Sequence, residues 1–352
     1  MKAGSSLVDI ANRLSIIKTE QEDLLVKPVG LHMVEDGRHF ALPEDPQQIH
    51  INPLPHHQVA THLKIPQQYY DRCREGAPEL LAHNVNQWMQ RTDKTRLLRT
   101  LNNGQGNRRL RGYLSDRYRP LDNYDLADAV LPVLESNGFQ IRSCQLTETR
   151  FYVKAILEEV TRDIEVGDTV CIGVDISNSD VGCASLSVAP LTERLICKNG
   201  MRVNDMASRR RHVGRRNNGF DEDSLVTEFL TDETRQADDR AFWLKVRDTV
   251  AACATEAMLE QIVDQMQVAK GVPITGDAHE VVRVVSRKVG ITESEESGVL
   301  NHLIRGGELN AFGLSNAITR HSQDVPDYDR ATELEGVGWT VMRLPQHDFA
   351  VN

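Results

Sequence analysis

Aromatic side chains make up only 5% of this 352-residue chain, and no apolar run approaches the roughly 20 residues that a membrane-spanning helix needs. The six cysteines are scattered and include no C-x-x-C pair, a pattern that favours reduced thiols over a disulfide framework or a zinc site. The first residues, MKAGSSLVDIANRLSII, lack the apolar core and cleavage site of a signal peptide and suit an amphipathic helix. We therefore expect a cytoplasmic protein without membrane contact, and one with few aromatic rings for stacking on a ligand.

Sequence motifs that name a reaction are also missing. There is no G-x-x-x-x-G-K-[ST], no G-x-S-x-G and no H-E-x-x-H, and the stretch NGQGNR lacks the third glycine of a dinucleotide-binding loop. His57 and His62 are five positions apart, so a helix does not place them on one face as a spacing of four would. The sequence therefore predicts no catalytic residue, no metal ligand and no cofactor, and an enzymatic role is the least favoured hypothesis.

The pattern of apolar residues divides the chain into three regions. Residues 1–90 combine short apolar runs with helical patterns, and residues 91–220 contain β-branched runs separated by turn residues. Residues 221–352 carry apolar side chains at helical spacing. This succession predicts an α+β fold with a central, mostly antiparallel sheet, packed helices and a helical C-terminal region.

Some helix ends and one turn can be predicted more closely. Pro66 favours a boundary between helices in HHQVATHL and PQQYYDRC, because the residue before a proline disfavours helical geometry. The alternation of apolar and polar residues around positions 147–150 predicts a hairpin. Thr292 and Glu295 have the spacing of a capping box, which predicts that a helix begins there.

Positive charge is concentrated in two segments of a chain whose formal net charge is −10. Residues 91–119 hold nine lysines or arginines against two aspartates, and residues 194–216 hold eight against one, so each segment has a local net charge of +7. The remainder of the chain then carries about −24. Such segregation indicates either a strongly dipolar molecule or two basic segments that converge on one acidic-backed surface.

Arginine rather than lysine dominates both basic segments. A guanidinium group can hold a phosphate with two parallel hydrogen bonds and can stack on a base, and clustered positive charge releases counterions from a polynucleotide. This pattern predicts a nucleic-acid-binding protein, with DNA, single-stranded or nicked, as the expected partner. The predicted phosphate-binding residues are Arg96, Arg99, Arg108, Arg109, Arg111, Arg117, Arg119, Lys198, Arg209, Arg210, Arg211, Arg215 and Arg216. Tyr113 and Tyr118 are the candidates for stacking on bases.

The charge pattern supports a second hypothesis equally well. An arginine run can neutralise acidic helices of its own chain, or it can dock on an acidic face of a neighbouring subunit. The chain would then be a structural or interaction protein. Under both hypotheses we expect a homo-oligomer.

Four stretches resemble the phage/plasmid-like proteins grouped as domain of unknown function 932. They are KIPQQYYDRCREGAPELLAHNVNQWM, RTLNNGQGNRRLRGYLSDRYRPLDNYDLADAVLPVL, SDVGCASLSVAPLTERLICKNGM and AFGLSNAITRHSQ, and they fall between Lys64 and the C-terminus. The resemblance implies an α+β protein carried by phages, plasmids or integrative elements, whose genes often lie near those for single-strand annealing and replication. That family has no established reaction, so the resemblance implies no catalytic residues.

Overall fold

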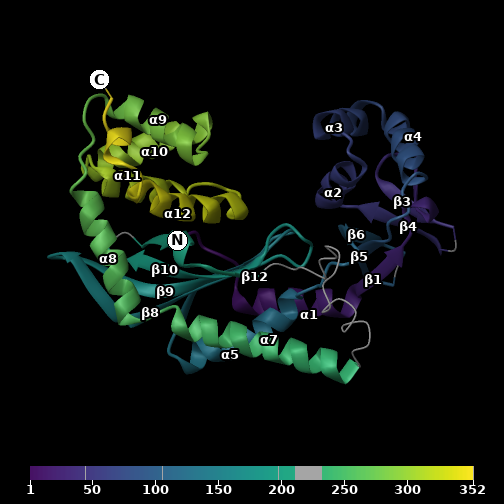
Figure 1. Ribbon diagram of the computed structural model, residues 1–352, viewed down its shortest axis with the longest axis horizontal. Coiled ribbons are helices and arrows are strands. Elements are labelled where there is room, and N and C mark those ends of the chain that lie inside the picture. The colour runs from purple at the N-terminus through teal and green to yellow at the C-terminus, as the bar shows by residue number, and fades with distance from the viewer. Residues whose placement is uncertain (44, 105, 197, 211–231, 352) are drawn as a thin grey trace, which may run out of the picture.

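The computed structural model describes residues 1–351 except 44, 105, 197 and 211–231, and it contains two β-sheets with helices packed against them (Figure 1). Strands within the sheets are antiparallel with one exception, and the described residues after 231 form helices joined by short connections. The predicted α+β class, the mostly antiparallel pairing and the helical C-terminal region are therefore confirmed. The sequence predicts one central sheet, whereas the chain forms two.

The first sheet, here called the N-terminal sheet, has the strand order β1-β5-β6-β4-β3-β2. Only β4 and β6 run parallel, and helices α2–α4 lie in the connection that leads from β4 to β5. These elements are β1 (Gln21–Val26), β2 (His32–Met33), β3 (His39–Leu42), β4 (Asp45–Ile51), α2 (Pro53–Leu63), α3 (Gln67–Gly76), α4 (Pro78–Met89), β5 (Arg96–Asn102) and β6 (Arg108–Ser115), with a 3-10 turn at Pro28–Gly30.

One core fills the space between this sheet and α2–α4. Alternate strand residues such as Phe40, Ile49 and Leu98 are completely buried in it, because successive side chains of a strand point to opposite faces. The predicted boundary between residues 90 and 91 falls inside this unit, since β5 and β6 pair with strands from before it. The predicted helix boundary at Pro66 is confirmed, as α2 ends at Leu63 and α3 begins at Gln67.

The second sheet, here called the long-strand sheet, has the order β11-β10-β9-β8-β7, and β12 also pairs with β10. All its pairs are antiparallel. The predicted hairpin at residues 147–150 joins β7 to β8, where the Thr147 N–H donates to the Arg150 carbonyl at 2.8 Å. The strands are β7 (Gln140–Leu146), β8 (Phe151–Glu165), β9 (Asp168–Asn178), β10 (Leu186–Arg194), β11 (Asn199–Arg202) and β12 (Ser208–Arg210).

Helices lie on both sides of the long-strand sheet, with α1, α5 and α7 on one side and α9–α12 on the other (Figure 1). Their apolar faces share one extended core with the sheet. The Thr292/Glu295 capping box is confirmed at the start of α10. The helices are α1 (Leu7–Glu20), α5 (Asn123–Ser136), α7 (Asp232–Ala252), α8 (Glu256–Lys270), α9 (Ala278–Val289), α10 (Glu293–Gly306), α11 (Ala311–His321) and α12 (Tyr328–Met342), with 3-10 turns at Asn204–Met206 and Gln346–Phe349. No helix among the described residues is both long enough and apolar enough to span a membrane.

Candidate nucleic-acid interface

Three of the predicted phosphate-binding arginines lie in the interior, and two of them, Arg99 and Arg111, link the two sheets through Asp180. Arg111 donates to both carboxylate oxygens of Asp180 at 2.9 and 3.0 Å, and Asp180 lies in the loop after β9. Arg99 donates to Asp23 at 3.0 Å, to Asp122 at 2.6 Å and to the Asp180 carbonyl at 2.7 Å. The junction between the N-terminal and long-strand sheets is therefore a buried network of arginines and aspartates.

Arg108, the first residue of β6, is also buried and paired with carboxylates. Its guanidinium group donates to Asp45 at 2.8 Å, to Glu22, and through Nε to the Thr100 hydroxyl at 3.2 Å. The exposed fractions of Arg99, Arg108 and Arg111 are 0%, 5% and 7%. These values correct the prediction for all three residues, because a buried guanidinium group already paired with carboxylates cannot face a phosphate.

The two tyrosines predicted to stack on bases also make contacts within the protein. Tyr113 is buried beside the His62 ring, with the Arg96 guanidinium 5.8 Å from its own ring centre, and burial raises its pKa to about 12. Tyr118 is partly buried, and its hydroxyl donates to the Ser179 carbonyl at 3.0 Å. The stacking prediction is therefore wrong for Tyr113. The hydroxyl of Tyr118 contributes a hydrogen bond to the sheet junction.

Arg96 is half-buried and donates to Nδ1 of His62. Burial and the neighbouring Arg96 charge lower the pKa of His62 to about 4, so this imidazole is a neutral acceptor at physiological pH. Burial also lowers the pKa of Arg96 itself. This pair belongs to the packing of α2 against β5 and leaves Arg96 poorly placed for a phosphate.

Arg109 differs from these residues because its side chain is exposed in a row of basic groups. The register places His39, His50 and Arg109 side by side on β3, β4 and β6. Nδ1 of His50 lies 3.4 Å from Nε2 of His39, and Nδ1 of His39 lies 2.5 Å from Asp36. Burial, together with the charges of His39 and Arg109, lowers the pKa of His50.

Two cavities of about 580 and 480 Å³ adjoin this row, and His39, His50 and Asn107 line both of them. Arg109 and Asn52 line the smaller cavity, together with Glu148 from the β7–β8 hairpin of the other sheet. Gln47, Gln48, Gly106 and the buried Arg108 complete the larger one. The walls therefore combine two arginines with imidazole and amide groups, which are suitable donors to phosphate oxygens, and with the carboxylate of Glu148.

The remaining predicted basic residues fall in three places. Arg117 and Arg119 are exposed in the connection from β6 to α5, next to the Tyr118 contact with Ser179. Lys198 is exposed in the turn after β10, whereas β12 pairs with the first residues of that strand. The two ends of β10 are roughly 26 Å apart at the usual rise per residue, so Lys198 lies at the far end of that strand from β12. The phosphate-binding role of Lys198 stays a prediction.

The second basic segment is only partly described. Arg209 and Arg210 lie in β12, opposite Ser187 and Leu186 of β10, while Arg211, Arg215 and Arg216 lie outside the described residues. The start of β10 follows the loop that carries Asp180, so the backbone of β12 lies near the sheet junction, at the end of the long-strand sheet that faces the N-terminal sheet (Figure 1).

The carboxylates that neutralise the arginines, and the row formed by His39 and His50, were not predicted from the sequence. Asp180 lies 69 positions from Arg111, and Glu22 lies 86 positions from Arg108. The only sequence signal was the excess of acidic residues outside the basic segments, which does not say which carboxylate pairs with which arginine. Strand pairing decides those partners.

Comparisons with protein-family models, with curated proteins and with solved structures found no match for this chain. The resemblance to domain of unknown function 932 therefore stays a prediction.

Proposed function

We propose that this protein binds a polynucleotide, with single-stranded DNA as the preferred class, at the exposed Arg109 of β6 and across the adjoining sheet junction. Arg109 supplies the central phosphate contact, with imidazole and amide donors from His39, His50 and Asn107 around it. Arg117 supplies a further contact beyond the other end of β6. The observation that carries the proposal is the exposed Arg109, which lies beside His39 and His50 and lines one of the two polar cavities.

The dimensions of this surface suit a chain of phosphates rather than a single one. Arg109 and Ser115 are the two exposed residues of β6 and lie roughly 20 Å apart at the rise of an extended strand, a distance that spans several phosphates, whereas residues 110–114 between them are buried. The buried arginines contribute a different property, because Arg99 and Arg111 both bond to Asp180 and so hold together the two sheets that frame this surface. Fewer arginines are available than the sequence predicts, so the affinity should be modest and its dependence on salt shallow.

A salt titration of binding to a labelled single-stranded oligonucleotide tests the proposal. The logarithm of the association constant should fall linearly with the logarithm of salt concentration, by about 0.7 for each phosphate contact. The double variant Arg109→Ala/Arg117→Ala should bind more weakly, and its slope should be shallower by about 1.4. Arg287→Ala, at an exposed position near the end of α9, is the matched control and should behave like the unmodified protein. An unaltered slope in the double variant would overturn the proposal.

The alternative hypothesis of an interaction protein predicts a different result. If the basic surface docks on a neighbouring subunit, Arg109→Glu/Arg117→Glu should shift the sedimentation profile in the absence of nucleic acid. Under the proposal, this charge reversal abolishes oligonucleotide binding and leaves the sedimentation of the free protein unchanged.

A further inference from the structure

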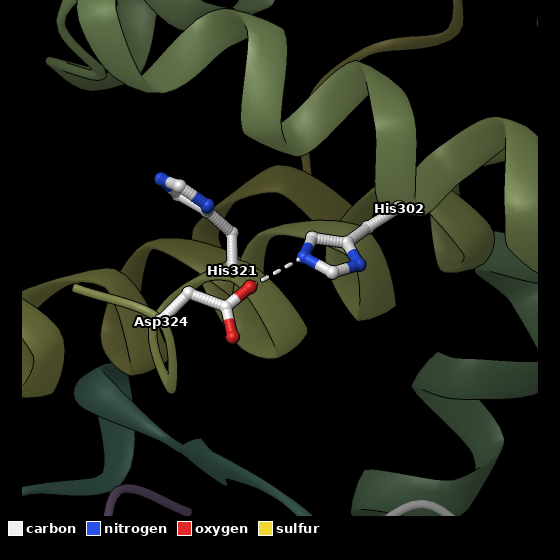
Figure 2. A group of neighbouring side chains, drawn as sticks. All are labelled: His302, His321 and Asp324. Atoms are coloured by element: carbon white, nitrogen blue, oxygen red, sulfur yellow. Dashed lines mark hydrogen bonds and ion pairs between the residues drawn. The ribbon is translucent and has the colours of Figure 1, made fainter.

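Two histidines and an aspartate gather between α10 and the end of α11, far from the surface described above. His302 lies on α10, His321 is the last residue of α11, and Asp324 lies one turn later. Nε2 of His302 lies 2.8 Å from Oδ2 of Asp324 (Figure 2). One potential ligand atom from each of the three residues lies within 4.8 Å of the other two.

The environment of His321 is unusual for a histidine whose only role is packing. Both ring nitrogens are buried and have no hydrogen-bond partner among the described residues. Leaving a buried polar atom unpaired costs about 1–3 kcal/mol. A cation held at one of these nitrogens would accept the lone pair that the protein leaves without a donor.

Gly298 on α10 makes room for this ring. A Cβ at position 298 would lie 2.4 Å from Cε1 and 2.5 Å from Nδ1 of His321. The absence of a side chain therefore allows the imidazole to sit against the backbone of α10, on the helix that carries His302. Two helices thus bring the histidines together through close packing.

Asp324 is held in place by groups on both sides. Oδ1 accepts from Arg320 at 3.1 Å, and Oδ2 faces His302. Burial opposes ionisation of Asp324, but the hydrogen bond with His302 and the Arg320 charge outweigh it and lower the pKa of this carboxyl group. Outer partners of this kind orient metal-binding carboxylates in known sites.

We propose that His302, His321 and Asp324 bind a divalent ion of the zinc type. Two imidazole nitrogens and one carboxylate oxygen form a donor set that Zn²⁺ and Co²⁺ accept in tetrahedral sites, and three protein ligands leave a fourth position for water. Ligand atoms around tetrahedral zinc are about 3.4 Å apart, so the three ligand atoms, which lie within 4.8 Å of one another here, must move closer together when the ion binds. The ion takes the place of the proton in the hydrogen bond between His302 and Asp324.

Calorimetric titration of metal-free protein with Zn²⁺, together with visible absorption of the Co²⁺ form, tests this assignment. The unmodified chain should bind one ion, show the strong absorption of four-coordinate Co²⁺, and melt at a higher temperature when Zn²⁺ is present. Asp324→Asn and His321→Ala should each weaken binding by about tenfold or more. His279→Ala, at an exposed position on α9, is the control and should change nothing.

The Asp324→Asn variant keeps the test informative if His321→Ala does not fold, because the amide has nearly the shape of the carboxylate it replaces. Circular dichroism of the metal-free variant verifies its fold. Lack of stoichiometric Zn²⁺ binding by the unmodified chain, or equal binding by a folded Asp324→Asn variant, would rule the site out. None of these measurements involves nucleic acid, so a failure of the metal site leaves the proposed function untouched.

Discussion

Nζ of Lys154 lies 2.6 Å from Oε2 of Glu335, and both side chains are completely buried between the long-strand sheet and α12. Lys154 also donates to the Thr332 hydroxyl at 3.0 Å. Burial disfavours the charged lysine, but the adjacent Glu335 carboxylate outweighs it, so the pKa of Lys154 is raised. This ion pair connects β8 to a helix that begins 174 positions later in the chain.

Replacing one member of this pair should lower the unfolding free energy far more than replacing both. Lys154→Met leaves the Glu335 charge buried without its partner, which typically costs about 3–5 kcal/mol of unfolding free energy. The double variant Lys154→Met/Glu335→Leu removes both charges and should recover most of that loss. Urea unfolding followed by circular dichroism gives the values. Equal losses in the single and double variants would show that the two charges do not act as a pair.

The ion pair between Arg111 and Asp180 should determine how firmly the two sheets are joined. Asp180→Asn removes the only side-chain partner that Arg111 has among the described residues, and it should lower the unfolding free energy by about 3 kcal/mol. Asp93→Asn makes the same chemical change at an exposed position and should have little effect. Thermal unfolding compares the two variants, and limited proteolysis should detect earlier cleavage at the junction in Asp180→Asn.

His56 should make stability depend on pH. Its Nδ1 lies 2.9 Å from the Tyr70 hydroxyl, and burial lowers its pKa from 6.5 to about 4. The unfolded chain therefore binds more protons between these values, so stability is complete above pH 6.5 and is lost as the pH falls toward 4. The contribution of His56 alone to the loss between pH 7.5 and pH 5 should be about 2 kcal/mol, and His62, whose pKa is lowered in the same way, adds to it.

The variant His56→Gln tests that assignment, because an amide keeps a polar partner for Tyr70 and does not titrate. Denaturation curves of this variant should change less between the two pH values than those of the unmodified chain. His57→Gln alters the exposed neighbouring histidine and should leave the pH dependence as it was. A pH dependence that persists unchanged in His56→Gln would assign the effect to other groups.

Gly173 should be indispensable for the pairing of β8 with β9. A Cβ at this position would lie 2.1 Å from the Ala155 carbonyl oxygen and 2.8 Å from Cα of Ile156. Gly173→Ala must push two central strands apart, and we expect a loss of about 3 kcal/mol or more. Gly76→Ala, where the added methyl group meets nothing within 4 Å, should be neutral or slightly stabilising in the same unfolding assay.

Local features of this chain follow directly from its sequence. The helix boundary at Pro66, the hairpin at residues 147–150 and the capping box at Thr292 each depend on residues within four positions of one another. Helix α12 lies in the region predicted to be helical, but its bounds were not predicted, because its face toward the sheet carries Glu335 and Thr332 as well as apolar residues. An ion pair with a distant residue of the chain compensates for that polarity. No local sequence pattern reveals this contact.

The amino-acid sequence by itself determined the fold class and the concentration of arginine in two segments. Tertiary structure decided what each arginine does, because antiparallel pairing brings Asp23 to Arg99 and the loop after β9 brings Asp180 to Arg111. A guanidinium group that meets a carboxylate in the interior becomes part of the framework, whereas Arg109, one position along the same strand from Arg108, points the other way and remains exposed. Strand alternation and contacts between distant segments decide which arginines are structural and which are available to a partner. Composition encodes neither of these features.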